Sequence, residues 1–153
     1  IKQSFGQLFM QRPKASSGSF GSIRLTYTKP PNLEIVGSGR KLYVHDKRAH
    51  KIDVLPLTAT PLVFILRGKI VLGNFIKEDN FTIERGVVHW TFSEPKGETP
   101  GAVTLLFDEK KGTLLGWHIH DVYGNTTKLM LFKAEVNRKI PPSTFKKPTI
   151  KDV

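Results

Sequence analysis

The chain has 153 residues, no cysteine, and 24 lysine and arginine residues against 13 aspartate and glutamate residues. A chain of this length can form one domain whose core needs no disulfide bridge, and the lack of cysteine excludes thiol catalysis and cysteine-bound zinc. The formal net charge of +11 favours anionic partners, namely nucleic acid, phospholipid headgroups or an acidic protein surface.

The pattern of apolar residues predicts a chain made mostly of antiparallel strands, each with one buried face. In chain order, we expect strands at residues 8–12, 23–27 and 41–46, a helix at 61–66, and strands at 87–92, 103–107, 115–121 and 128–132. Residues 108–112 and 121–125 have the composition of hairpin loops. No apolar run approaches the roughly 20 residues that a membrane-spanning helix needs.

The segment at residues 60–68 is the only clear helix that the sequence predicts. Thr60 can cap this helix, Pro61 suits its first position and Gly68 suits a left-handed exit. Its side chains are apolar nearly all the way round, so the helix must be covered on both sides or form one wall of an apolar space. We therefore expect it to be a lid over a ligand. The helix residues expected to contact that ligand are Leu62, Phe64 and Ile65.

The predicted strands carry more apolar and aromatic surface than one short helix can cover. Two arrangements would bury this surface, because the strands could pack against one another as a sandwich or curl around an apolar cavity. Most of these residues would be ordinary core in either arrangement. The strand residues expected to line the cavity are Met10, Leu25, Tyr27, Trp90, Phe92, Leu105, Phe107, Trp117 and Ile119.

Two groups of polar residues are candidates for a metal site or a catalytic site. His118 and His120 lie two apart on a predicted strand and share a face, which is one geometry for metal ligation, but the sequence offers no third ligand. His45, Asp46 and His50 resemble an acid-base set, but nothing fixes a nucleophile beside them. The sequence therefore predicts no catalytic residue, no metal site and no cofactor.

Short stretches spread over most of the chain occur in a distinctive order. They are residues 8–13, 24–27 with Pro30, 34–36, 42–46, 60–62, 105–108, 116–117 and 124–129. This ordered series resembles the periplasmic outer-membrane lipoprotein carrier family, LolA. The resemblance implies a single domain over residues 1–153, mainly β (α+β), whose strongly curved antiparallel sheet forms an incomplete β-barrel covered by a short apolar helix lid. Relative to the family, we expect the N-terminal helix and the first strand to be missing.

The resemblance also implies a function. A member of this family is a non-enzymatic periplasmic carrier that sequesters the acyl chains of lipoproteins in a hydrophobic cavity, here in a mature form without signal peptide. It receives acylated lipoproteins from an inner-membrane transporter and passes them to an outer-membrane acceptor, and nucleic acid is not a partner. Arg12 coincides with the family's latch arginine, which holds the lid helices by hydrogen bonds to their backbone. A guanidinium beside Leu8 and Met10 on one strand face needs such acceptors.

Two alternative functions stay open. One is an envelope protein with the same half-barrel that binds or senses a lipid or a peptide. The other is a basic, β-rich module that binds nucleic acid through interleaved aromatic and basic residues. Trp90 and Trp117 alternate with aliphatic residues, which indicates an inner face and weighs against an exposed platform for stacking bases.

The excess of positive charge suggests a docking surface. Arg40, Lys41, Arg48 and Lys51 are expected near one rim of the half-barrel, where they would speed encounter with acidic partners. The alternative is a basic surface that is merely solvated.

Overall fold

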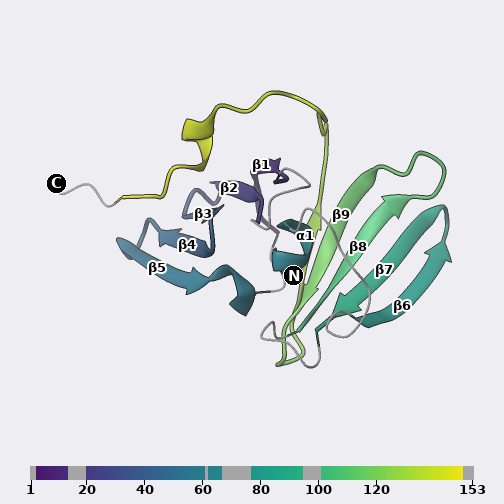
Figure 1. Ribbon diagram of the computed structural model, residues 1–153. Coiled ribbons are helices and arrows are strands. Elements are labelled where there is room, and N and C mark those ends of the chain that lie inside the picture. Colours follow the sequence, from purple (N-terminus) through teal and green to yellow (C-terminus); the bar gives the residue numbers. More distant parts are fainter. Residues whose placement is uncertain (1–2, 14–19, 61, 67–76, 95–100, 150–153) are drawn as a thin grey trace. The chain divides into compact units, whose positions relative to one another are not determined.

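The computed structural model describes residues 3–13, 20–60, 62–66, 77–94 and 101–149. Within these ranges the chain is mainly β, with ten strands in two five-stranded antiparallel sheets (Figure 1). The chain divides into two compact units. The first consists of Ile1–Leu57, Leu66–Lys69 and Lys139–Val153, and the second consists of Thr58–Ile65 and Ile70–Arg138.

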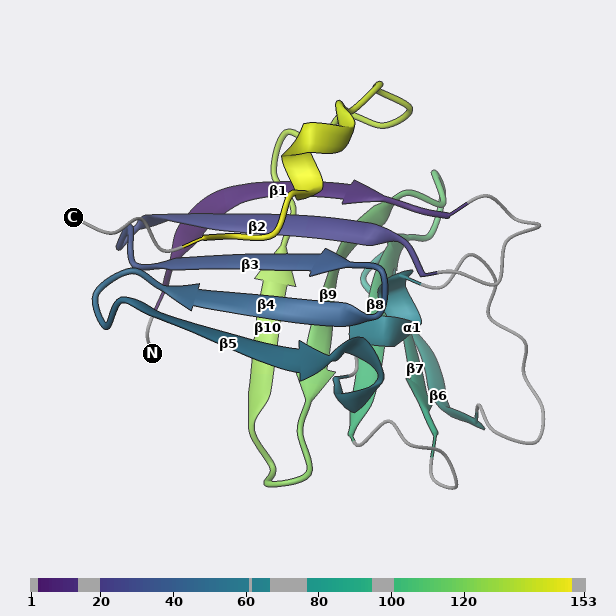
Figure 2. The same ribbon diagram turned by 60° about the vertical axis from the view of Figure 1, so that its left-hand side comes forward.

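The first unit contains a sheet in which each strand pairs with the next along the chain. Its strands are β1 (Phe5–Gln11), β2 (Ser22–Lys29), β3 (Leu33–Ser38), β4 (Lys41–Asp46) and β5 (Lys51–Pro56), which lie side by side in Figure 2. Leu25 on β2 is opposite Leu8 on β1 and Ile35 on β3. This register puts apolar residues on one face of the sheet, because successive side chains of a strand point to opposite faces.

A 3-10 helix, η2 (Pro142–Phe145), packs on strands β2 and β3 of this sheet. Proline at its first position fits a helix start, because that position needs no N–H donor. Phe145 is only 7% exposed, so the C-terminal segment contributes an aromatic side chain to the core of the first unit.

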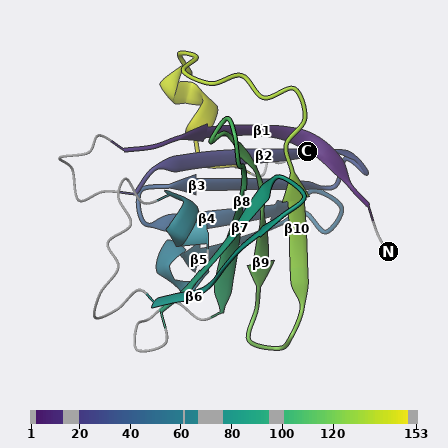
Figure 3. The same cartoon turned by 90° about the vertical axis from the view of Figure 1, so that its right-hand side faces the viewer.

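The second unit contains the other sheet, which also follows the order of the chain. Its strands are β6 (Lys77–Glu84), β7 (Val87–Ser93), β8 (Ala102–Asp108), β9 (Leu114–His120) and β10 (Thr126–Met130), as Figure 3 shows. Both predicted hairpin loops are confirmed. Asp108 accepts hydrogen bonds from the backbone N–H groups of Lys110 and Lys111, and Asp121 does the same for Tyr123 and Asn125.

The helix expected at residues 61–66 is present in part. A 3-10 helix, η1 (Leu57–Ala59), precedes an α-helix of five residues, α1 (Leu62–Leu66). Val63 and Leu66 are fully buried, as the apolar pattern predicts. Pro61 and Gly68, the expected start and exit of the helix, lie outside the described residues.

The prediction of one strongly curved sheet is wrong in its topology. All seven predicted strands exist, but the described strands form two separate sheets and no closed barrel. The first five strands form one sheet and the last five form the other. β5 and β6, the strands on either side of the helical segment, do not pair with each other. No helix within the described residues has the length and apolar character needed to span a membrane.

Candidate functional site

One face of the second sheet carries a continuous row of apolar side chains. Trp90 on β7 is opposite Phe81 on β6 and Leu105 on β8. Trp117 on β9 is in turn opposite Leu105 and Leu129 of β10. The row therefore crosses all five strands on one face.

The same face holds every strand residue of this unit that the sequence predicted to line an apolar site. The rows on either side of the Trp90 row are also apolar. On one side, Val88 is opposite Phe107. On the other side, Phe92 is opposite Val103, and Val103 is opposite Ile119. The predicted residues that the register brings together here are Trp90, Phe92, Leu105, Phe107, Trp117 and Ile119.

Burial along this face falls from the middle of the sheet toward its β6 edge. Trp117 is 2% exposed and Leu105 is 5% exposed, whereas Phe81 and Ile83 of β6 are each 49% exposed. An open apolar surface at this edge is the part of the face that a ligand can reach. Phe81 and Ile83 were not predicted because charged and polar residues dominate β6, although their spacing of two residues was a usable signal.

Three aromatic rings lie together at this open edge. The ring of Trp90 is 5.7 Å from that of Phe81, edge to face, and 4.7 Å from that of Phe92, in a tilted arrangement. The indole Nε1 of Trp90 is buried and has no hydrogen-bond partner in the described part of the chain. An unpaired buried donor is uncommon and costs free energy, so this atom calls for an explanation.

The first sheet also has an apolar face, to which Met10, Leu25 and Tyr27 belong, as predicted. Leu25 lies in a row with Leu8, Ile35 and Val44, and all four are partly exposed. The neighbouring row is more buried. It contains Met10, Ile23 at 2% exposure, Gly37, and Leu42 at 4% exposure.

Gly37 marks the tightly packed end of that face. A Cβ atom at this position would lie 2.8 Å from the Ile23 side chain and 3.6 Å from the Leu66 side chain. The backbone of Leu66 is bound here too, because its carbonyl accepts a hydrogen bond of 2.7 Å from the N–H of Gly21. The last residue of α1 is therefore fixed to the first unit by packing and by a backbone hydrogen bond.

The residues of α1 that were predicted to contact a ligand differ in their exposure. Ile65 is 2% exposed, and Leu62 is partly exposed. The side chain of Phe64 lies outside the described residues. Since Val63, Ile65 and Leu66 are buried, most of this short helix is part of the core in the structure, and its role as a lid stays a prediction.

The predicted latch residue, Arg12, follows the end of β1 and is exposed. An arginine does bond to a helical carbonyl in the first unit, but it is Arg24 on β2. Its Nη1 donates a hydrogen bond of 3.1 Å to the carbonyl oxygen of Thr144 in η2. The role of Arg24 was not predicted, because the sequence did not indicate the helix that carries its acceptor.

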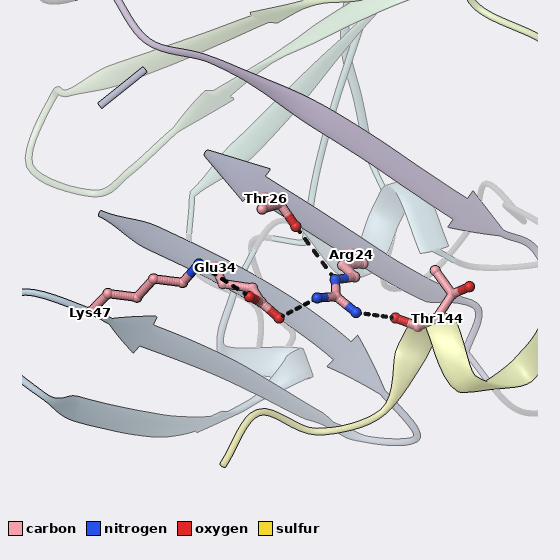
Figure 4. A network of polar contacts seen from close by, with 5 residues as sticks. All are labelled: Arg24, Thr26, Glu34, Lys47 and Thr144. Carbon is pink, nitrogen blue, oxygen red and sulfur yellow. Dashed lines mark hydrogen bonds and ion pairs between the residues drawn. The ribbon is translucent and has the colours of Figure 1, made fainter. Parts of the chain in front are cut away.

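Arg24 is the centre of a polar network on the face opposite Leu25 (Figure 4). Its Nη2 forms an ion pair of 2.9 Å with Glu34, and its Nε donates a hydrogen bond of 3.4 Å to the Thr26 hydroxyl. The Glu34 side chain is only 12% exposed and also forms an ion pair of 3.7 Å with Lys47. The network joins β2, β3 and η2 in the first unit.

The four predicted docking residues do not cluster. Arg40 and Lys41 lie where β4 begins, whereas Arg48 and Lys51 lie in or beside the turn after β4 ends. The length of the strand separates the two pairs, so the expectation of one basic rim is wrong. Arg40 stacks over Phe20 at 5.6 Å, and Lys51 forms an exposed ion pair with Asp53.

The opposite face of the second sheet carries three neighbouring histidines. The ring of His118 is 6.5 Å from that of His89 and 6.2 Å from that of His120. Burial lowers the pKa of His118 below its usual value, and the positive charge of Lys128 and the two neighbouring histidines lower it further. Within the described ranges, no three potential metal ligands are grouped so that they could hold an ion.

A chain of side-chain hydrogen bonds crosses four strands beside these histidines. The hydroxyls of Thr91 and Thr104 are 2.7 Å apart, Thr104 is 2.9 Å from Nε2 of His120, and Nδ1 of His120 is 3.1 Å from the Thr126 hydroxyl. Thr104 is 6% exposed, so its hydroxyl needs these partners. These hydrogen bonds tie β7, β8, β9 and β10 together.

Comparison with known proteins points to one family. The family model described as "Outer membrane lipoprotein carrier protein LolA" matches residues 1–148. An outer-membrane lipoprotein carrier protein of Dechloromonas aromatica is 28% identical over 159 residues, which cover 95% of this chain and 76% of the relative. Proteins with the same name from Methylococcus capsulatus and Methylobacillus flagellatus are 29% and 26% identical, covering 94% and 95% of this chain and 67% and 68% of the relatives.

Proposed function

The chain belongs to the LolA family of outer membrane lipoprotein carrier proteins, and we propose that it carries lipoproteins through the periplasm by binding their acyl chains. The observation that supports this most is the apolar row from Phe81 to Leu129, which crosses the second sheet and ends in a half-exposed edge. Exposed apolar surface of this kind marks a binding site for an apolar ligand or partner. The partly exposed row around Leu25 on the first sheet supports the same proposal.

Burial of apolar surface alone can supply the affinity that a carrier needs. Each methylene group moved from water to an apolar surface gains about 0.8 kcal/mol, so ten methylenes gain about 8 kcal/mol. This free energy corresponds to a dissociation constant of about 1 µM before the cost of ordering the chain is subtracted. No covalent step and no cofactor are needed.

The direction of transport is part of the proposal. The chain would receive lipoproteins from an inner-membrane transporter and pass them to an outer-membrane acceptor. Release requires something that competes with the acyl chain, and α1 with its apolar side chains is the element that would do so as a lid. Arg12, exposed in this structure, would then act as the latch on a lid backbone.

A pair of matched variants tests the acyl site. Ile83 and Val54 are both β-branched residues of edge strands, with exposures of 49% and 51%, but Val54 lies on the Arg24 face of the first sheet. We expect Ile83→Glu to weaken binding of a fluorescent fatty-acyl probe at least tenfold, because a carboxylate opposes acyl contact at the open edge. Val54→Glu should leave the affinity unchanged. Equal effects of the two variants would contradict the proposed site.

Salt separates this proposal from the nucleic-acid alternative. Binding of an acyl probe should be unaffected between 50 and 200 mM salt, roughly the range over which a protein that contacts several phosphates loses about a thousandfold or more in affinity. A steep loss of oligonucleotide binding with no acyl binding at any salt concentration would favour the nucleic-acid module instead.

A further inference from the structure

The indole N–H of Trp90 is a buried donor in an apolar environment. Its neighbours across the strands are Phe81 and Leu105, and its neighbours along the same face of β7 are Val88 and Phe92. None of these four side chains has a hydrogen-bond acceptor. A buried tryptophan N–H normally finds a partner, so the side chains around this one do not explain it.

The position of Trp90 lets a ligand supply that partner. Trp90 contacts Phe81, which is 49% exposed on the edge strand, and it is itself partly exposed although its nitrogen is buried. A molecule that lies over the open edge therefore reaches the tryptophan before it reaches Leu105 or Trp117, which are 5% and 2% exposed. The edge is where the polar end of a long apolar ligand would remain.

We propose that the Trp90 indole N–H donates a hydrogen bond to a carbonyl oxygen at the head of the bound acyl chain, either an ester or an amide carbonyl. This inference rests on the proposed function and adds a specificity determinant to it. The methylene tail lies on the exposed side chains of Phe81 and Ile83, and the carbonyl pairs the buried donor at the same open edge. Trp90 thereby distinguishes acyl chains from alkyl chains of equal length, since only the acyl chain has the acceptor.

Two lipids that differ only in this acceptor provide the test. Dioctanoylglycerol has two ester carbonyls, whereas dioctylglycerol ether has the same tails and none. The wild-type protein should bind the diester about fivefold more tightly than the diether, which is the contribution of about one hydrogen bond. In Trp90→Phe, which keeps an aromatic ring but has no donor, the two affinities should become equal. Tyr43→Phe is the control, because it removes a donor from an aromatic side chain on the Arg24 face of the first sheet and should keep the preference for the diester.

Nuclear magnetic resonance gives a second readout that does not depend on a variant. The chain has two tryptophans, so the indole region holds two N–H signals, and Trp90→Phe identifies one of them. We expect the Trp90 indole proton to move downfield when the diester binds and to move much less when the diether binds.

The outcomes separate the two proposals. If the wild-type protein binds both lipids equally and the indole proton responds equally to both, the role of Trp90 is wrong and the acyl site stands. If neither lipid binds the wild-type protein, the proposed function fails and the role of Trp90 fails with it. Retention of the diester preference in Trp90→Phe would also overturn the inference.

Discussion

The attachment of η2 to the first sheet depends on Arg24, and its replacement by methionine should destabilise this unit. Methionine keeps most of the apolar stem but removes the ion pair of 2.9 Å to Glu34 and the hydrogen bond of 3.1 Å to the Thr144 carbonyl. The Glu34 side chain is 12% exposed, and among the described residues it would keep its ion pair with Lys47, at 3.7 Å. Hydrogen bonds to charged groups contribute roughly 1.5–3 kcal/mol, and the 31% exposure of the Arg24 side chain places the expected loss near the middle, at about 2 kcal/mol.

Urea denaturation followed by circular dichroism measures this loss. With a dependence on urea of about 2 kcal/mol per molar, the midpoint for Arg24→Met should fall by about 1 M. Lys47→Met is the matched control, because it removes the longer and more exposed contact to the same carboxylate. That variant should shift the midpoint by less than about 0.5 M, since exposed ion pairs contribute at most about 1 kcal/mol in most cases. Equal midpoints for the two variants would refute the reasoning.

A proteolysis measurement links the same change to η2. Lys146 and Lys147 follow the helix directly and are exposed. If Arg24 holds η2 on the sheet, trypsin should cleave after Lys146 faster in Arg24→Met than in the wild-type protein. The bond after Lys147 is not a readout, because Pro148 follows it. An unchanged cleavage rate together with a lower midpoint would mean that Arg24 stabilises the sheet alone.

Three further predictions concern the second sheet. Gly116→Ala should lower the free energy of unfolding by about 2 kcal/mol, because a Cβ atom there would clash with the carbonyl oxygen of Leu129. Thr104→Val should cost about 1–3 kcal/mol, because it breaks the hydroxyl chain at a buried position, whereas Thr104→Ser should cost less. Stability should also fall between pH 7.5 and pH 5. The lowered pKa of His118 means that the unfolded chain takes up a proton at about 6.5 while the folded chain resists it until lower pH, and His118→Gln should flatten this dependence.

Midpoints of urea denaturation test all three predictions. An unchanged midpoint for Gly116→Ala would mean that the hairpin of β9 and β10 relaxes around a methyl group. If the serine and valine variants of Thr104 lose equal stability, the hydroxyl is not what matters. Parallel pH curves for the wild-type protein and His118→Gln would remove His118 as the source of the acid sensitivity.

The sequence predicted those strands whose apolar residues recur at every second position. β7, β8 and β9 have dense alternating apolar residues because they lie inside a sheet, and all three were predicted. Three strands were missed, namely β3, β5 and β6. β3 is an inner strand whose sequence, Leu33–Ser38, does not alternate cleanly between apolar and polar residues. β5 is an edge strand in which Val54 and Leu55 follow each other and break the alternation, and β6 is an edge strand whose exposed residues are mostly charged or polar. An edge strand needs such residues to avoid pairing with other chains, and the same residues hide its periodicity.

The site could be predicted in composition but not in geometry. Period-two spacing was enough to group Trp90, Phe92 and Trp117 on one face, since strand alternation fixes which residues share a face. The prediction of one docking surface failed because its residues lie at opposite ends of β4. A strand of six residues keeps the turn before it and the turn after it apart, although both are close in the sequence. Arg24 was missed because its partner in η2 is 120 positions away, and no local pattern signals a contact at that separation.

The central claim is that this chain carries lipoproteins by holding their acyl chains, and native mass spectrometry tests it most directly. The protein is mixed with a purified triacylated lipoprotein in detergent, the detergent is removed, and the soluble fraction is weighed. A matched lipoprotein whose acylated cysteine is replaced by serine is treated in the same way. We predict a soluble one-to-one complex with the acylated lipoprotein and none with the unacylated one. Failure to keep the acylated lipoprotein in solution, or equal binding of both forms, would contradict the account.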